Sequence, residues 1–301
     1  MGPTLAVMAR RAAKAAGHAL EVIAVSRFSD AGVRAWLERQ GVTVIGADLL
    51  EPGALTPLPD ARTVIYMVGQ KFGTGKTPGA TWAMNVLVPA RVAERYPGAT
   101  LVALSTGNVY PLSPVSQGGA VETDALAPAG EYAMTAMGRE RIFEFYSLRG
   151  NTPTALLRLC YAVELRYGVL VDLAQKVRAA DPIDLTNGFF NCIWQGDAND
   201  MILRAASLAA TPPSVWNLCR PDIYSVRAVA TRLGELLDRA PVFAGTENAT
   251  ALLANPARLC AALGAPPTPL ETMLRWIASW VKLGGRSLGK PTHFEVRDGK
   301  Y

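Results

Sequence analysis

The chain has 301 residues, half of them apolar, which is enough for a sizeable core in one large domain or in a large domain with a smaller lobe. Its formal net charge of +5 is spread along the sequence without a basic cluster, so nucleic acid is not an expected partner. No apolar run approaches the roughly twenty residues that cross a bilayer, and the first residues lack a signal peptide's apolar stretch, so we expect a cytoplasmic protein with no membrane partner.

Alternating helices and strands are expected along the first part of the chain. Apolar residues at helical spacing predict a helix over 3–16, and a short β-branched run predicts a buried strand over 21–25. The same criteria predict further helices over 30–40 and 82–96 and strands over 42–45, 61–68 and 100–104. This alternation indicates a doubly wound α/β fold with a parallel sheet, whose ligands bind at the carboxyl ends of the strands.

The second part of the chain is less regular. Residues 154–159 predict one more strand, and prolines interrupt most of the sequence beyond it. We therefore expect the sheet domain over 1–160 and a smaller mixed lobe, interleaved with the sheet, over 161–301. The two histidines stand far apart, so no metal site is expected. No C-x-x-C pair occurs, and we expect reduced, buried thiols at Cys160, Cys192, Cys219 and Cys260.

Several short strings, in a fixed order along the chain, resemble those of the extended short-chain dehydrogenase/reductase family in its epimerase/dehydratase branch. Residues 105–110 read Ser-Thr-Gly-Asn-Val-Tyr and are similar to the family's Ser-Ser-x-x-Val-Tyr string. Residues 122–128 resemble its acidic, proline-closed approach to the catalytic helix, and residues 193–197 resemble its Val-x-Asp string, with Asp197 in a structural role at a helix start. The resemblance implies a Rossmann-like NAD(P)-binding domain over 1–160 and a substrate lobe over 161–301.

The resemblance also implies the catalytic pair, Thr106 and Tyr132. The Thr106 hydroxyl would hydrogen-bond the reacting substrate oxygen, and the Tyr132 phenol would transfer a proton while the nicotinamide carries a hydride. The alternative for Thr106 is a simple cap of the turn that comes after its strand.

The family's lysine, four residues after the tyrosine, is replaced by Ala136. An ordinary phenol, with a pKa of about 10, is ionised to only on the order of a thousandth at neutral pH. Turnover is therefore expected to be slow unless another cation substitutes. Arg139 lies about two helical turns from Tyr132, which is too far. Lys71, in the loop after the strand over 61–68, is the better candidate, and its alternative is an exposed, solvated lysine.

Cofactor contacts are implied in the same way. Ser26 and Arg27 come after a strand end where NAD enzymes place an acid, so Arg27 favours NADP over NAD, with an ordinary surface arginine as the alternative. The glycine that ends the family's glycine-rich turn corresponds to Gly2. The remaining implied positions are Asp48, Leu49, Val68, Gly69, Asn85, Ser105 and Tyr161.

The beginning of the chain departs from the usual dinucleotide-binding unit, which starts with a strand, continues through a glycine-rich turn and then enters a helix. This chain opens at the helix, with Gly2 at the end of the implied turn. We therefore expect the natural protein to begin upstream of Met1. Without the first strand, the two strands that normally flank it would keep unpaired edges, at on the order of 1 to 3 kcal/mol for each buried, unsatisfied group.

Two functions are consistent with these residues. The first is an NAD(P)-dependent oxidoreductase, epimerase or dehydratase that acts on a hydroxyl or carbonyl of a sugar-like or nucleotide-sugar substrate. The alternative is a non-catalytic nucleotide-binding regulatory or scaffold protein, which Ala136 would permit. The resemblance implies a homodimer that pairs through its two long helices, over 85–96 and 132–148.

Overall fold

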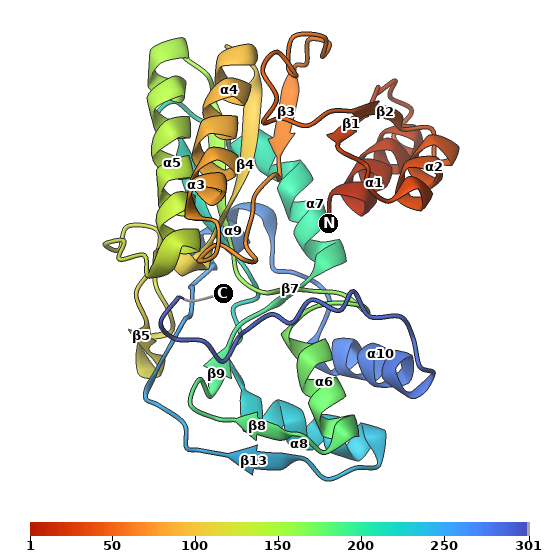
Figure 1. Cartoon of the computed structure of the whole chain (residues 1–301), viewed down its shortest axis with the longest axis vertical. Helices are drawn as coiled ribbons and strands as arrows, with labels where there is room; N and C mark the ends of the chain where they lie inside the picture. Colours follow the sequence, from red (N-terminus) through yellow and green to blue (C-terminus); the bar gives the residue numbers. More distant parts are fainter. Residues whose placement is uncertain (300–301) are drawn as a thin grey trace.

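The computed structural model describes residues 1–299, and a parallel sheet forms its centre (Figure 1). Four strands pair in parallel in the order β11–β6–β4–β3. Their bounds are β3 Thr63–Tyr66, β4 Thr100–Thr106, β6 Thr154–Leu159 and β11 Ser214–Leu218. The two inner strands are buried over most of their length, as expected for strands covered on both faces. The predicted doubly wound α/β fold is confirmed.

Successive residues of β4 face opposite sides of the sheet. Leu101 and Ala103 pack with Phe143 on one side, whereas Val102 packs with Ile202 on the other. The first side is covered by helices α3 (Pro78–Trp82), α4 (Val88–Arg95) and α5 (Gly130–Gly150), and the second by α7 (Gln195–Arg204) and α1 (Gly2–Ala15).

A second parallel pair, β1 (Ile23–Ser26) and β2 (Thr43–Gly46), lies to one side of β3 together with α1 and α2 (Ala31–Arg39) (Figure 1). Within residues 1–299, β1 pairs only with β2, and β3 pairs only with β4. The sheet is therefore interrupted between β1 and β3, at the position where the sequence analysis expects a further strand.

The smaller lobe has its own core, which α6 (Val169–Ala179), α8 (Val226–Leu237) and α10 (Leu270–Lys282) form together. Strand β11 returns from this lobe to the main sheet, as an interleaved arrangement requires. Short strand pairs complete the fold: β8 Pro182–Asp184 with β13 Val242–Ala244, β9 Phe189–Phe190 with β12 Tyr224–Ser225, β10 Ile193–Trp194 with β7 Ala162–Val163, and β14 Thr250–Ala251 with β5 Ser113–Pro114. Helix α9 spans Ala257–Leu263.

The elements predicted over the first 160 residues are present, with ends that differ by a few residues. The largest difference concerns the helix predicted to begin at Trp82. The helical segment begins at Pro78, because the fixed backbone of proline suits the first turn of a helix. Asn85 consequently lies inside a π-helical turn, Ala83–Leu87, and not at a helix start. Among residues 1–299, no helix combines the length and the apolar character that a membrane crossing requires.

The end of the chain runs back from the lobe to the sheet domain (Figure 1). We call residues 286–299 the C-terminal segment. It reaches the start of α5, where a Cβ on Gly130 would lie only 2.2 Å from the carbonyl oxygen of Gly299. Gly130 also has a φ of +79°, so glycine is required there for two reasons. The start of α5 and the C-terminal segment are therefore packed directly against each other.

Candidate active site

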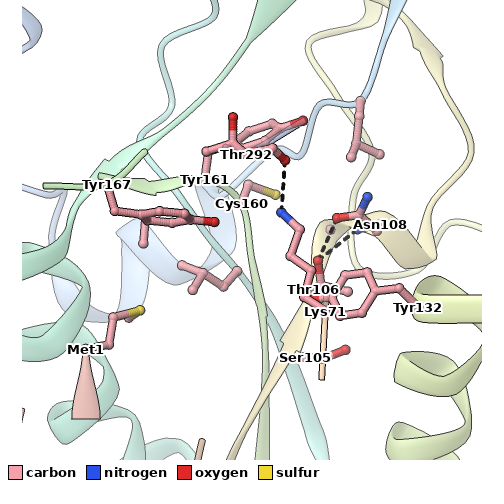
Figure 2. A pocket seen from close by; sticks show the side chains of 14 residues that line it. Met1, Lys71, Ser105, Thr106, Asn108, Tyr132, Cys160, Tyr161, Tyr167 and Thr292 are labelled. Carbon is pink, nitrogen blue, oxygen red and sulfur yellow. Dashed lines mark hydrogen bonds between the residues drawn. The ribbon is translucent and has the colours of Figure 1, made fainter. Parts of the chain in front are cut away.

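A cavity of about 220 Å³ lies at the carboxyl ends of β4 and β6 (Figure 2). Side chains from the sheet domain, the lobe and the C-terminal segment meet there. The three predicted catalytic residues are all in its wall, together with the predicted Tyr161 and Ser105. The lining residues are Met1, Lys71, Ser105, Thr106, Gly107, Asn108, Tyr132, Leu159, Cys160, Tyr161, Ala162, Tyr167, Leu252 and Thr292.

Thr106 is the last residue of β4, and its hydroxyl both caps the turn after the strand and lines the cavity. Its Oγ1 accepts a hydrogen bond from the Asn108 backbone N–H at 3.2 Å and donates to Asn108 Oδ1 at 2.9 Å. It therefore caps the short 3-10 helix Gly107–Val109, as the alternative interpretation predicts. The same hydroxyl lies in the cavity wall, so capping and lining are compatible.

Tyr132 enters the cavity from the first turn of α5. Figure 2 shows its ring directed towards Thr106 and Lys71. The replaced lysine position, Ala136, lies one turn further along α5 and is fully buried in an apolar cluster with Val109 and Cys160. The wall of the cavity thus contains the phenol but not residue 136.

Lys71 extends into the cavity from the loop between β3 and α3, and its ammonium donates to the Thr292 carbonyl oxygen at 3.4 Å. Burial lowers the pKa of Lys71 to about 8, and the Asp172 carboxylate opposes this shift. The alternative of an exposed, solvated lysine is wrong, because Lys71 is half-buried between two parts of the molecule.

Two further residues beside the cavity were not found from the sequence. Tyr167 lines it just before α6, and burial raises its pKa to about 12. Asp172, in the first turn of α6, has its pKa raised by burial, while two hydrogen bonds from Thr292 lower it. An acid in the first turn of a helix is common for reasons of helix stability, so the sequence carried no signal for Asp172.

Asn85 does not reach the cavity, but it fixes the loop that leads to Lys71. The Gln70 N–H donates to its Oδ1 at 2.7 Å, and its Nδ2 donates to the Gln70 carbonyl at 2.9 Å and to Thr135 Oγ1 at 2.9 Å. Asn85 therefore connects this loop to α5, which carries Tyr132.

A buried ion pair between β6 and α5 lies next to the cavity wall. Arg158 Nη2 lies 2.8 Å from Glu140 Oε2, and both side chains are about 5% exposed or less. Ser105 Oγ donates to Glu140 at 2.5 Å, and Arg158 donates to the Tyr110 hydroxyl at 2.7 Å. Burial raises the pKa of Tyr110 to about 12, so its hydroxyl stays protonated and donates to Asn217. The Ser105 side chain is thus committed to this network, although the residue lines the cavity.

The other predicted cofactor residues lie outside the cavity wall. Ser26 and Arg27 are exposed at the carboxyl end of β1. Asp48 accepts a hydrogen bond from the Leu50 N–H at 3.1 Å and closes a turn after β2. Leu49 and Val68 pack against the core, and Gly69 lies against the Arg139 guanidinium.

A comparison with protein-family models identifies the family of this chain. The model of the NAD dependent epimerase/dehydratase family matches residues 8–166, more than half of the chain. The chain belongs to this family. A search of curated protein sequences finds no match.

Solved structures of several nucleotide-sugar enzymes share the fold. UDP-glucuronic acid 4-epimerase from Bacillus cereus, in complex with NAD, has a TM-score of 0.78 at 16% identity over 93% of each chain. UDP-glucose 4-epimerase from Thermotoga maritima has a TM-score of 0.75 at 15% identity, over 93% of this chain and 96% of that one. MoeE5, in complex with UDP-glucose and NAD, has a TM-score of 0.71 at 18% identity, over 88% and 99%. At these identities the likeness establishes the fold alone.

The start of α1 fits the cofactor of this family. Helix α1 begins at Gly2, no side chain caps its first turn, and Met1 lines the cavity. The first backbone N–H groups of a helix lack partners within the helix and bind phosphate groups well. Because Pro3 has no N–H, the first turn of α1 offers those of Gly2 and Thr4. A Cβ on Gly2 would meet nothing within 4 Å, so the backbone is open to a close approach there. These residues suit the pyrophosphate of a dinucleotide.

Proposed function

We propose that the chain is an NAD(P)-dependent epimerase, dehydratase or oxidoreductase that moves a proton at a hydroxyl or carbonyl of a sugar-like or nucleotide-sugar substrate. The observation that carries this proposal is the meeting of Thr106, Tyr132 and Lys71 in one cavity at the carboxyl ends of the strands. The nucleotide-sugar class is supported by solved proteins that share the fold: two 4-epimerases, in complex with UDP-glucose and with UDP-glucuronic acid, and MoeE5, in complex with UDP-glucose.

Each of the three residues has a separate role in this proposal. Thr106 Oγ1 hydrogen-bonds the reacting oxygen and orients it. Tyr132 accepts the proton from a hydroxyl or returns it to a carbonyl. Lys71 supplies the positive charge that favours the phenolate, in place of the family lysine. The cofactor, when bound, supplies or accepts the hydride.

The first turn of α1 would hold the pyrophosphate in this proposal, and the exposed end of β1 would hold the adenosine side. Arg27, at that end, supports a preference for NADP, because a planar guanidinium binds a 2′-phosphate with two parallel hydrogen bonds. Asp48, Leu49, Val68, Gly69 and Asn85 are proposed to shape this side of the site, directly or by fixing its loops.

We also propose a cytoplasmic homodimer. Apolar side chains are exposed on neighbouring helices of the sheet domain: Phe145 is 53% and Leu148 57% exposed on α5, and Trp82 43% and Leu87 45% exposed on the helical segment beside it. Trp82 Nε1 donates to Glu131 at the start of α5, so the two helical segments that carry these side chains are linked there. Four free cysteines support a reducing compartment.

The proposal is tested with purified protein, both nicotinamide cofactors and a panel of UDP-sugars. Tyr132→Phe should abolish turnover, and Lys71→Ala should lower kcat by at least tenfold. Because burial lowers the pKa of Lys71 to about 8, the wild-type rate of carbonyl reduction, in which the phenol gives up its proton, should fall above that pH. Lys71→Arg keeps its charge at all accessible pH values, so this fall should disappear.

Cofactor binding without turnover of any sugar would instead support the non-catalytic alternative, which the buried Ala136 favours. Full activity in Tyr132→Phe would exclude the proposed acid/base. The fluorescence of the reduced cofactor reports binding independently of turnover.

A further inference from the structure

The C-terminal segment supplies part of the cavity wall. Thr292 lines the cavity and is 1% exposed, and Phe294, also 1% exposed, belongs to the core of the lobe. Asn187 in the lobe donates to the Phe294 carbonyl. On the sheet-domain side, the segment contacts Gly130. Its position in the wall is therefore fixed from both sides.

Asp172 fixes the segment at the cavity itself. Its Oδ2 accepts hydrogen bonds from the Thr292 N–H at 2.8 Å and from Thr292 Oγ1 at 2.6 Å. Burial raises the pKa of Asp172, and these two bonds lower it; Glu295 adds to the rise and Lys176 to the fall. Two donors on one oxygen hold Thr292 in place by its backbone N–H and its side chain.

Thr292 also supplies the acceptor of the Lys71 ammonium, through the next peptide group. The Thr292 carbonyl oxygen, on the same residue, accepts from Lys71 Nζ at 3.4 Å (Figure 2). The Asp172 carboxylate also stabilises the charged form of Lys71 electrostatically. A continuous series of contacts thus connects α6 to the loop after β3 through residue 292.

Other titratable groups surround the same space. Tyr132 reaches it from α5, Cys160 and Tyr161 from the end of β6, and Tyr167 from the residues before α6. His293, on the C-terminal segment, packs against the ring of Phe72 beside Lys71. These side chains are phenols, a thiol and an imidazole, and Met1, which also lines the cavity, adds a buried N-terminal amine near Glu164 and Arg166. Asp172 is the carboxylate that interacts electrostatically with Lys71.

We propose that Asp172, acting through Thr292, is a positioning residue for Lys71: it fixes the carbonyl that receives the ammonium and places a negative charge opposite it. This inference rests on the proposed catalytic role of Lys71 and assigns the lobe and the C-terminal segment a part in the same site.

The test measures the Lys71 titration directly. Trace labelling with an amine reagent at a series of pH values, read by mass spectrometry, gives the pKa of each lysine in the folded protein without requiring turnover. Wild-type Lys71 should titrate near pH 8. Asp172→Asn removes the negative charge, so the pKa of Lys71 should fall by about one unit. The alkaline fall of the kcat profile should move to lower pH by the same amount.

Two further variants separate charge from packing. Asp172→Glu keeps the charge and should leave the pKa of Lys71 close to the wild-type value. Asp197 provides a control, because it also binds the N–H and the hydroxyl of one threonine: its Oδ2 accepts from the Thr268 N–H at 2.9 Å and its Oδ1 from Thr268 Oγ1 at 2.8 Å. Asp197 is not in the cavity wall, so Asp197→Asn should leave Lys71 unchanged.

The inference is overturned if wild-type Lys71 titrates near the ordinary lysine value of about 10.4. It is also overturned if Asp172→Asn leaves that pKa unchanged or raises it, or if Asp172→Glu or Asp197→Asn shifts it downward equally. If Asp172→Asn fails to fold, the wild-type titration and Asp172→Glu still decide. Full activity of Lys71→Ala would refute the proposed catalytic role of Lys71. The labelling experiment tests the role of Asp172 separately, because it does not require turnover.

Discussion

Asn85 holds both backbone groups of Gln70, the residue before Lys71, with one amide side chain. Because Asn85 is fully buried, its removal leaves the Gln70 N–H and carbonyl without these partners. Each loss costs about 1 to 3 kcal/mol. We expect Asn85→Ala to lower the free energy of unfolding by on the order of 3 kcal/mol in urea titrations and to lower kcat.

The control for this variant is Asn248→Ala, which removes a single exposed hydrogen bond to the Thr186 carbonyl. Its stability should stay within about 0.5 kcal/mol of wild type. An Asn85→Ala protein of wild-type stability would show that water replaces the amide, and that the loop does not depend on it.

Introducing the missing family lysine at position 136 should not raise the rate of turnover above that of wild type. The Ala136 side chain is fully buried among apolar groups, and an unpaired buried charge costs about 3 to 5 kcal/mol. We expect Ala136→Lys to lower the thermal midpoint strongly, whereas Ala136→Ser should have a small effect. A faster, stable Ala136→Lys enzyme would contradict this expectation and show that the new side chain reaches the cavity.

The catalytic helix shows how much of the site could be predicted from the sequence. The strings at 105–110 and 122–128 indicated Thr106 and Tyr132. Both side chains line one cavity, because Thr106 ends a strand and Tyr132 lies in the first turn of a helix. Lys71 was found from its position in a loop after a strand. The partners of Lys71 were not found from the sequence. Asp172 and Thr292 are separated from Lys71 by 101 and 221 residues and lie near it only in the folded chain.

Individual side chains were harder to assign than the fold. The alternation of helices and strands predicted the parallel sheet, since local periodicity determines which faces are buried. Ser105 and Asn85 were assigned to the cofactor, but their polar groups bind Glu140 and Gln70. A buried hydroxyl or amide in a family string can hydrogen-bond either a neighbouring protein group or a bound ligand. The sequence does not show which of these partners it has.

Cofactor choice should depend on Arg27. We expect wild type to bind NADP more tightly than NAD, and Arg27→Ala to lose about a hundredfold in NADP affinity, the effect of two parallel charge-assisted hydrogen bonds of roughly tenfold each. NAD affinity should be unchanged. Fluorescence titration with both reduced cofactors measures this. Arg34→Ala, on the neighbouring helix α2, is the control, and equal affinities for both cofactors in wild type would contradict the assignment.

The exposed apolar surface on α5 should be a dimer interface. Phe145→Glu combined with Leu148→Glu places two charges there, and we expect light scattering to report a monomer with an unchanged thermal midpoint in dilute solution. Leu283→Glu is the matched control, because Leu283 is 83% exposed at the end of α10. A monomeric wild type, or a dimeric double variant, would exclude this surface.

The interrupted sheet should be visible in amide hydrogen exchange. The Thr100 N–H donates to the Arg62 carbonyl across β3 and β4. Because hydrogen bonds alternate along a strand, the N–H groups of Val64 and Tyr66 point towards β4, whereas those of Thr63 and Ile65 point towards the open edge.

The same alternation applies to β1. The Thr43 and Ala47 N–H groups donate to the carbonyls of Val22 and Ser26. The even-numbered residues of β1 therefore pair with β2, and the N–H groups of Ile23 and Val25 point to the other side. Within residues 1–299, β1 and β3 each pair with one neighbour, so each has an open edge.

We expect the Thr63, Ile65, Ile23 and Val25 amides to exchange at least tenfold faster than those of Val64 and Tyr66, measured residue by residue by NMR. The comparison is internal to β3, so differences in global stability cancel. Amides of the inner strands β4 and β6 should be the slowest. Equal protection of all the β3 amides would contradict the interrupted sheet, because an amide that resists exchange at an edge must have a hydrogen-bond partner there.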